Sequence, residues 1–266
     1  MKESSVRRGM EMAFFIMKKP KSILVTGATS GVGYALTKRL QLEGHEVWAT
    51  GRSLNILLEL QAEGVHTIPA DLTKEEDIKR LIAQIGTPDC VIFSAGIGTF
   101  GLAHEISDEF IQSMLDVNVL APIKLTKLLL PDMLERKSGH IIYLGSQAGK
   151  VATPKAAVYA ATKHAIIGYT NALRMEVAPF GIHVTTINPG PIDTPFLDLA
   201  DQTGNYRVSL GNYLLTVDSV VNAIVLAIEK PVREVNLPWY MGITSKLHSV
   251  APTLVERLGR RFFMKK

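Results

Sequence analysis

Residues 22–33 decide the fold, and they read Ser22-Ile23-Leu24-Val25-Thr26-Gly27-Ala28-Thr29-Ser30-Gly31-Val32-Gly33. The first four residues form an apolar run that is typical of a buried strand. A helical pattern follows the glycines and ends at Gly44. Glycines at such a turn let backbone N–H groups approach a pyrophosphate, and the start of the helix adds a positive dipole. The spacing Gly-x-x-x-Gly-x-Gly therefore predicts a dinucleotide site formed by Gly27, Thr29, Ser30, Gly31, Val32 and Gly33.

Further strands and helices alternate along the chain after this turn. We expect strands at 47–50, 65–68, 90–93, 140–144 and 183–187. We expect helices at about 54–63, 74–85, 107–133 and 156–180, with Pro122 bending the third of these or lying near a joint in it. This alternation predicts an α/β fold with a doubly wound parallel sheet, in three layers α/β/α.

The domain organisation is expected to be simple. Residues 1–19 are interpreted as an N-terminal extension that is loosely ordered, and 20–266 as a single domain. The stretch 191–216 is polar and only weakly periodic, and it follows the sixth strand. Because ligands bind beyond the carboxyl ends of the strands in such folds, we interpret it as a substrate lid, with an ordinary surface loop as the alternative.

Composition sets limits on the function. The 266 residues carry a net charge of +4, much of it near the two ends, and a single cysteine, Cys90, in an apolar run. A buried thiol and a reducing, cytoplasmic location are expected. We interpret the basic ends as solvated, although nucleic acid or an anionic membrane would also attract them. No His, Cys or carboxylate cluster has metal-ligand spacing, so we expect no metal. We expect no nucleic-acid partner, because the basic ends are interpreted as solvated.

Tyr159 and Lys163 are the first candidates for chemistry. A spacing of four places both side chains on one helix face. A lysine charge favours the phenolate, so it is expected to lower the pKa of Tyr159 from about 10 and make it a general acid/base. Ser146, thirteen residues upstream, has a hydroxyl that can hold a substrate oxygen. Taken alone, a Tyr and a Lys four residues apart also occur by chance on many helices.

The residues after the second and third strands bear on the choice of cofactor. Gly51 and Arg52 stand where an acidic residue would bind the ribose 2′-hydroxyl of NAD. An arginine can clamp a 2′-phosphate, so NADP is expected in preference to NAD, and a solvated arginine is the alternative. Asp71 and Leu72 are expected to flank the adenine, although Asp71 could instead cap the helix that begins near Thr73.

These motifs together resemble the short-chain dehydrogenase/reductase family, in its compact single-domain branch. The resemblance covers about residues 20–230 and rests on the glycine motif, on the spacing of Ser146, Tyr159 and Lys163, and on the turn 188–190. It implies a Rossmann fold, with Asn118 supporting a water chain that leads to Lys163. It also implies that Lys163 binds the nicotinamide ribose. The residues expected near the nicotinamide and the phosphates are Pro189, Gly190, Ile192 and Thr194.

One departure from the family pattern follows the fourth strand. The family usually has Asn-Asn-Ala-Gly there, whereas this chain has Phe93-Ser94-Ala95-Gly96. Ala95 and Gly96 keep the close approach to the cofactor ribose. The missing asparagine side chains usually brace neighbouring backbone, so Ser94 or water is expected to do part of that work, with altered local stability rather than lost catalysis.

The resemblance implies NADPH-dependent reduction of a carbonyl, or the reverse oxidation of a secondary alcohol, with Asn118, Ser146, Tyr159 and Lys163 as the catalytic set. A non-catalytic NADP-binding sensor or scaffold is the alternative. The partners expected are a small carbonyl or alcohol substrate and further copies of the chain in a homodimer or homotetramer. Residues 237–266 are aromatic, aliphatic and basic, and we expect them to pack over the substrate pocket or an interface rather than contact a membrane. Their composition slightly favours an apolar substrate.

Overall fold

The computed structural model describes residues 19–201 and 203–263. Residues 1–18 of the expected N-terminal extension therefore lie outside the described residues. Seven strands form one parallel sheet in the order β3-β2-β1-β4-β5-β6-β7. The strands are β1 (Ser22–Thr26), β2 (Glu46–Gly51), β3 (His66–Pro69), β4 (Cys90–Phe93), β5 (Gly139–Leu144), β6 (Ile182–Pro189) and β7 (Glu234–Leu237).

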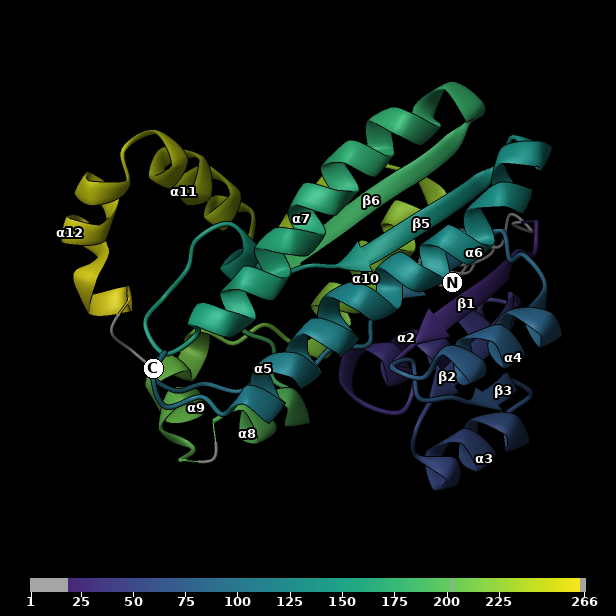
Figure 1. Ribbon diagram of the computed structural model, residues 1–266, viewed down its shortest axis with the longest axis horizontal. Helices are drawn as coiled ribbons and strands as arrows, with labels where there is room; N and C mark the ends of the chain where they lie inside the picture. The colour runs from purple at the N-terminus through teal and green to yellow at the C-terminus, as the bar shows by residue number, and fades with distance from the viewer. Residues whose placement is uncertain (1–18, 202, 264–266) are drawn as a thin grey trace, which may run out of the picture.

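Helices cover both faces of the sheet, as the alternating pattern predicts (Figure 1). Apolar side chains of α2 (Gly31–Leu42), α3 (Leu54–Ala62) and α10 (Val217–Glu229) join the core on one face. Those of α4 (Glu75–Ile85), α6 (Ala121–Arg136) and α7 (Ala157–Val177) form the core on the other face. The three-layer doubly wound fold is thus confirmed, and Cys90 lies buried in its core as expected.

The order of the strands fixes where a ligand can bind. The chain runs outward from β1 through β2 to β3, and then crosses to β4 on the other side of β1. The loops that follow β1 and β4 therefore leave the sheet in opposite directions and open a crevice at its carboxyl edge. The glycine turn after β1 and residues 94–96 after β4 both lie at this crevice.

The helix expected at 107–133 is divided into three parts. The parts are α5 (Asp108–Leu115), a π-helical turn (Asp116–Leu120) and α6, which has Pro122 in its first turn. Proline has no N–H to donate, and the chain accommodates it at the π turn, in which the neighbouring Ala121 N donates to Asp116 O. Pro122 thus lies at a joint, one of the two positions expected for it, and the π turn places Asn118 in the buried interior.

Two elements near the end of the sheet were not predicted. The edge strand β7 reads Glu-Val-Asn-Leu, which is too short and too polar to stand out, and α10 precedes it. The stretch 191–216 contains α8 (Pro195–Ala200) and α9 (Asn205–Leu210). Two backbone hydrogen bonds, from Asp193 N to Leu215 O and from Leu215 N to Pro191 O, join the two ends of this stretch.

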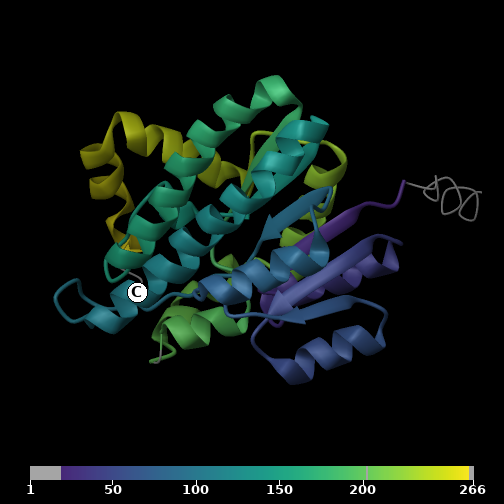
Figure 2. The same ribbon diagram turned by 45° about the vertical axis from the view of Figure 1, so that its right-hand side comes forward.

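Two further helices complete the chain beyond β7. They are α11 (Trp239–Val250) and α12 (Pro252–Phe263). In Figures 1 and 2 they form a pair at the opposite side of the molecule from β2 and β3, and α12 turns back toward the segment that holds α8 and α9. Within the residues described, no helix combines the length and the apolar character needed to cross a membrane.

Candidate active site

One pocket of about 650 Å³ runs along the carboxyl edge of the sheet. Its walls come from the glycine turn, from the ends of β2 to β6, from α7, and from α8, α9, α11 and α12. All but two of the expected site residues line it, in the following order along the chain: Gly27, Thr29, Ser30, Gly31, Val32, Arg52, Asp71, Leu72, Ser94, Ala95, Gly96, Ser146, Tyr159, Lys163, Pro189, Gly190, Ile192 and Thr194. The other two, Gly33 and Asn118, lie behind the wall.

The glycine turn is shaped for close backbone contact. Gly27 has φ +67°, and a Cβ there would lie 2.6 Å from the Cα of Ala95. A Cβ on Gly33 would lie 2.3 Å from the carbonyl oxygen of Gly27. Glycine is the residue that meets both requirements, because any side chain would push the turn away from the strands or from the helix. The cradle that results at the start of α2 fits a pyrophosphate, so the residues present suit a dinucleotide.

Arg52 and Asp71 line the opposite end of the pocket from Tyr159. The Arg52 side chain is exposed at the end of β2. Partial burial disfavours the charged form of Asp71, but hydrogen bonds from Thr73 and the nearby charge of Arg52 outweigh it and hold the pKa of Asp71 below its usual value. Asp71 Oδ1 accepts from both the N–H and the hydroxyl of Thr73, at 3.1 and 2.8 Å. Asp71 therefore braces the turn before α4, close to the capping role that was the alternative expectation.

The residues after β4 are braced by a side chain that the sequence did not suggest. The hydroxyl of Thr26, at the end of β1, accepts from Ala95 N at 3.2 Å and donates toward Ile92 O at 3.4 Å. Ser94 lies beside the glycine turn, since its Oγ would be 3.2 Å from a Cβ on Gly33. Part of the bracing expected of Ser94 thus comes from the neighbouring strand.

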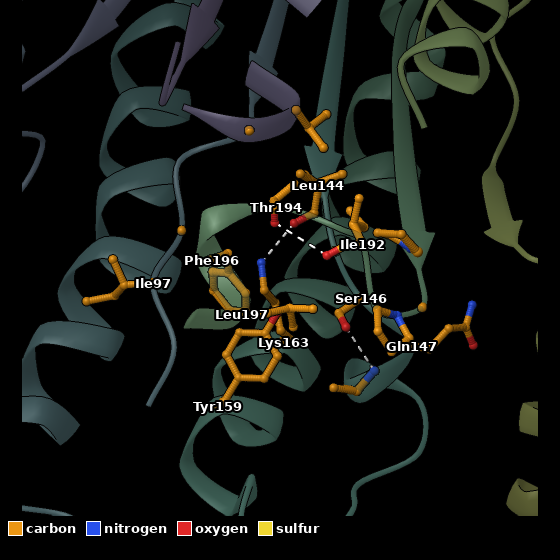
Figure 3. Close-up of a pocket in the computed structure, with 18 of the residues that line it drawn as sticks. Ile97, Leu144, Ser146, Gln147, Tyr159, Lys163, Ile192, Thr194, Phe196 and Leu197 are labelled. Atoms are coloured by element: carbon orange, nitrogen blue, oxygen red, sulfur yellow. Dashed lines mark hydrogen bonds between the residues drawn. The ribbon is translucent and has the colours of Figure 1, made fainter. Parts of the chain in front are cut away.

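Tyr159 and Lys163 lie one helical turn apart on α7 and face the same pocket (Figure 3). Lys163 Nζ lies 5.7 Å from the centre of the Tyr159 ring and donates to Leu144 O at 2.9 Å. Ser146 follows β5, and its Oγ accepts from Ala148 N at 3.0 Å, which holds the oxygen in place. The structure thus brings these three side chains together at the end of β5.

The expected direction of the Tyr159 pKa shift is wrong in this structure. Burial raises the pKa of Tyr159 to about 12, with the Ser146 hydroxyl acting in the opposite direction. Burial also lowers the pKa of Lys163 to about 8. The sequence shows that a lysine is near but not how deeply the pair is buried, and desolvation opposes the charged form of both groups. The phenol is therefore protonated at neutral pH.

Asn118 lies in the π-helical turn and holds the backbone on the other side of the site. Its Oδ1 accepts from Ile97 N at 2.9 Å, and its Nδ2 donates to Ile97 O at 2.8 Å and to the Thr162 hydroxyl at 3.1 Å. A Cβ on Gly96 would lie 3.4 Å from Asn118 Oδ1 and 3.7 Å from Lys163 Nζ. Asn118 Oδ1 and Lys163 Nζ thus both lie close to the same point beside Gly96.

Several residues that line the pocket were not predicted from the sequence. Gln147 donates from Nε2 to Asn188 O at 2.7 Å and to Asn236 Oδ1 at 3.0 Å, and so ties the pocket wall to β6 and β7. Its position directly after Ser146 was the available signal. Phe100, Phe196 and other apolar residues of the wall come from segments far apart in the chain. Nothing local in the sequence marks them, because only the tertiary fold brings them together.

The parallel sheet, its strand order and the glycine cradle define a dinucleotide-binding α/β protein. The family model for short chain dehydrogenases matches residues 21–204, and the chain belongs to this family. It is therefore an oxidoreductase of the short-chain dehydrogenase type.

Similar proteins include characterised and uncharacterised oxidoreductases. An uncharacterized oxidoreductase of Staphylococcus aureus is 34% identical over 228 residues, covering 82% of this chain and 94% of that protein. The ketoacyl reductase HetN of Nostoc is 33% identical and covers 91% and 89% of the two chains. The closed form of a serine dehydrogenase complexed with NADP+ superposes with a TM-score of 0.75 at 30% identity, over 81% of this chain and 93% of that one.

Proposed function

We propose that this protein catalyses the NADPH-dependent reduction of a carbonyl to a secondary alcohol, or the reverse oxidation. The observation that carries the proposal is that Tyr159, Lys163 and Ser146 converge on the pocket that begins at the glycine turn. A dihydronicotinamide bound there would supply a hydride to the carbonyl carbon. The name of the Nostoc relative, a ketoacyl reductase, supports a carbonyl substrate.

Tyr159 is proposed as the general acid. Burial keeps its hydroxyl protonated at neutral pH, which is the form that can give a proton to the carbonyl oxygen as the carbon gains the hydride. The Ser146 hydroxyl orients that oxygen. Lys163 holds the cofactor ribose and supplies positive charge beside the phenolate that forms when Tyr159 gives up its proton. Asn118, which holds Ile97 and Thr162, positions the backbone around Lys163.

NADP is proposed as the preferred cofactor. Arg52 lines the pocket after β2, where a guanidinium can pair with a 2′-phosphate in a bidentate manner. The similar serine dehydrogenase was solved with NADP+, which agrees with this choice. Part of the Arg52 charge acts on Asp71, so the phosphate would share the guanidinium with a carboxylate.

The test is NADPH oxidation across a panel of ketones, with two tyrosine variants. Tyr159→Phe is expected to lower turnover by at least about 100-fold, since a positioned proton donor contributes about 10²–10⁴-fold. The matched control is Tyr169→Phe, on the same helix but partly buried against the core, which is expected to keep wild-type turnover. NADPH binding, followed by cofactor fluorescence, should be retained in both. Binding without turnover on any ketone would instead favour the sensor or scaffold.

A further inference from the structure

The half of the pocket beyond Tyr159 has a mainly apolar and aromatic wall. Phe196 lies with its ring centre 5.6 Å from that of Tyr159, and Phe100 lies 6.1 Å from Tyr159 in an edge-on arrangement. Tyr206 in turn lies 5.3 Å from Phe100. Figure 3 shows Phe196 and Leu197 beside the Tyr159 and Lys163 side chains. Aromatic rings therefore surround the place where a substrate carbonyl would meet Tyr159.

The C-terminal helices supply a further part of this wall. Met241 of α11 and Val255 and Gly259 of α12 line the pocket. Val255 and Gly259 are four residues apart and so lie on one face of α12. Leu254 and Leu258 lie on another face and are 58% and 78% exposed. One face of α12 is thus turned to the pocket, and its neighbouring face is not.

The charged side chains of the described pocket wall lie in its cofactor half. Among the described residues that line it, the charged ones are Arg52 and Asp71 at the far end and Lys163 beside Tyr159. Arg207 of α9 lies close by, but its guanidinium is tied to Asp193 and to both carboxylate oxygens of Asp198. A carboxylate or ammonium group on the substrate would find no counter-charge among the described wall residues beyond Tyr159. Burying an unpaired charge in such surroundings is costly.

We propose that the substrate is an uncharged ketone with an extended apolar body, an aliphatic chain or an aromatic group, which lies between the α8–α9 segment and the α11–α12 pair. This inference rests on the proposed carbonyl chemistry and adds the class of substrate. The aromatic rings beside Tyr159 hold the part of the substrate next to the carbonyl. Met241 and Val255 contact the part farther from it.

The first test is a series of methyl ketones from butanone to undecanone, each reduced with NADPH. Because a buried methylene contributes about 0.8 kcal/mol, kcat/KM should rise about three- to fourfold per carbon until the pocket is filled. Levulinate is the charged comparator, since its size is close to that of hexanone. Its kcat/KM is expected to be at least about 100-fold below that of hexanone. A flat series, or levulinate and hexanone reduced equally well, would overturn the inference.

The second test compares two substitutions on α12. Val255→Asp places a carboxylate in the wall and should lower kcat/KM for nonanone about tenfold or more, through KM, while NADPH affinity is unchanged. Leu258→Asp, on the exposed face of the same helix, should leave nonanone reduction as in the wild type. Equal losses in the two variants, or none in either, would contradict the assignment of this wall to the substrate.

A binding measurement separates this inference from the proposed function. Calorimetry on the Tyr159→Phe variant with NADP+ should detect binding of nonanone. It should detect no binding of the charged compounds levulinate and L-serine. If no ketone is reduced but nonanone still binds selectively, the carbonyl chemistry fails and the apolar ligand class stands. If ketones are reduced without dependence on chain length, the chemistry stands and the ligand class fails.

Discussion

The ammonium of Lys163 lies 5.7 Å from the centre of the Tyr159 ring, and both groups are held in a pocket that disfavours their charged forms. Burial separates their pKa values, to about 12 for the phenol and about 8 for the ammonium. Burial of the Lys163 ammonium therefore lowers the stability of the fold. No ion pair among the described residues offsets this loss. Such a cost is typical of functional sites.

Replacing this lysine should stabilise the protein. The pKa of Lys163 falls from 10.5 to about 8 on folding. The folded state thus disfavours the protonated form of Lys163. The resulting loss of folding stability is complete below about pH 8 and disappears as pH rises toward 10.5. Lys163→Met should raise the free energy of unfolding by about 1–3 kcal/mol at pH 7, and by less at pH 9.5. Urea denaturation at the two pH values measures this.

The control for this stability prediction is Lys127→Met, which replaces an exposed lysine of α6. It should change the free energy of unfolding by no more than about 0.5 kcal/mol at either pH. A Lys163→Met variant that is destabilised at pH 7, or whose gain grows with pH, would show that burial does not disfavour the ammonium.

Cofactor choice should depend on Arg52. Arg52→Ala is expected to raise the Kd for NADPH by about 10- to 100-fold, because a charge-assisted pair with a phosphate contributes about 1.5–3 kcal/mol. The Kd for NADH, which has no 2′-phosphate, should change little. Arg39→Ala removes an exposed arginine of α2 that pairs with Glu43, and it should affect neither cofactor. Equal losses of both cofactors in Arg52→Ala would remove the argument for NADP.

Two glycine-to-alanine substitutions should have opposite effects. At Gly33 the new Cβ would lie 2.3 Å from the Gly27 carbonyl oxygen, so Gly33→Ala should lower the free energy of unfolding by about 3 kcal/mol or more. Gly168, in the middle of α7, has nothing within 4 Å of the Cβ position. Gly168→Ala should raise the free energy of unfolding by about 0.5–1 kcal/mol. Thermal unfolding followed by circular dichroism compares the two, and a tolerated Gly33→Ala would mean that the turn is not tightly packed.

Much of the fold and site could be predicted because their signals are local. The strand before Gly27 and the four-residue spacing of Tyr159 and Lys163 are read directly from neighbouring residues. The edge strand β7 could not be predicted, because it is short and its residues are half-buried and partly polar. The bracing of Ala95 by Thr26 depends on a contact between residues that are 69 positions apart in the sequence.

The pocket wall and the pKa shifts depend on tertiary burial. Phe100, Phe196 and Val255 line one pocket only after the α8–α9 and α11–α12 segments have folded against the sheet. The direction of the Tyr159 shift likewise depends on how completely water is excluded from the pair, which no spacing reports. The sequence therefore predicts the candidate site residues, and the structure is needed to predict their ionisation states.

The transfer of a hydride to a carbonyl is tested most directly by isotope labelling. NADPH that carries deuterium at nicotinamide C4, on the transferred face, is mixed with nonanone and the wild-type protein. The account predicts that the alcohol formed carries one deuterium on its carbinol carbon for each NADPH consumed, and that Tyr159→Phe slows this transfer by at least about 100-fold while still binding NADPH. Oxidation of NADPH with no deuterium in the alcohol, or equal transfer by the wild type and Tyr159→Phe, would contradict it.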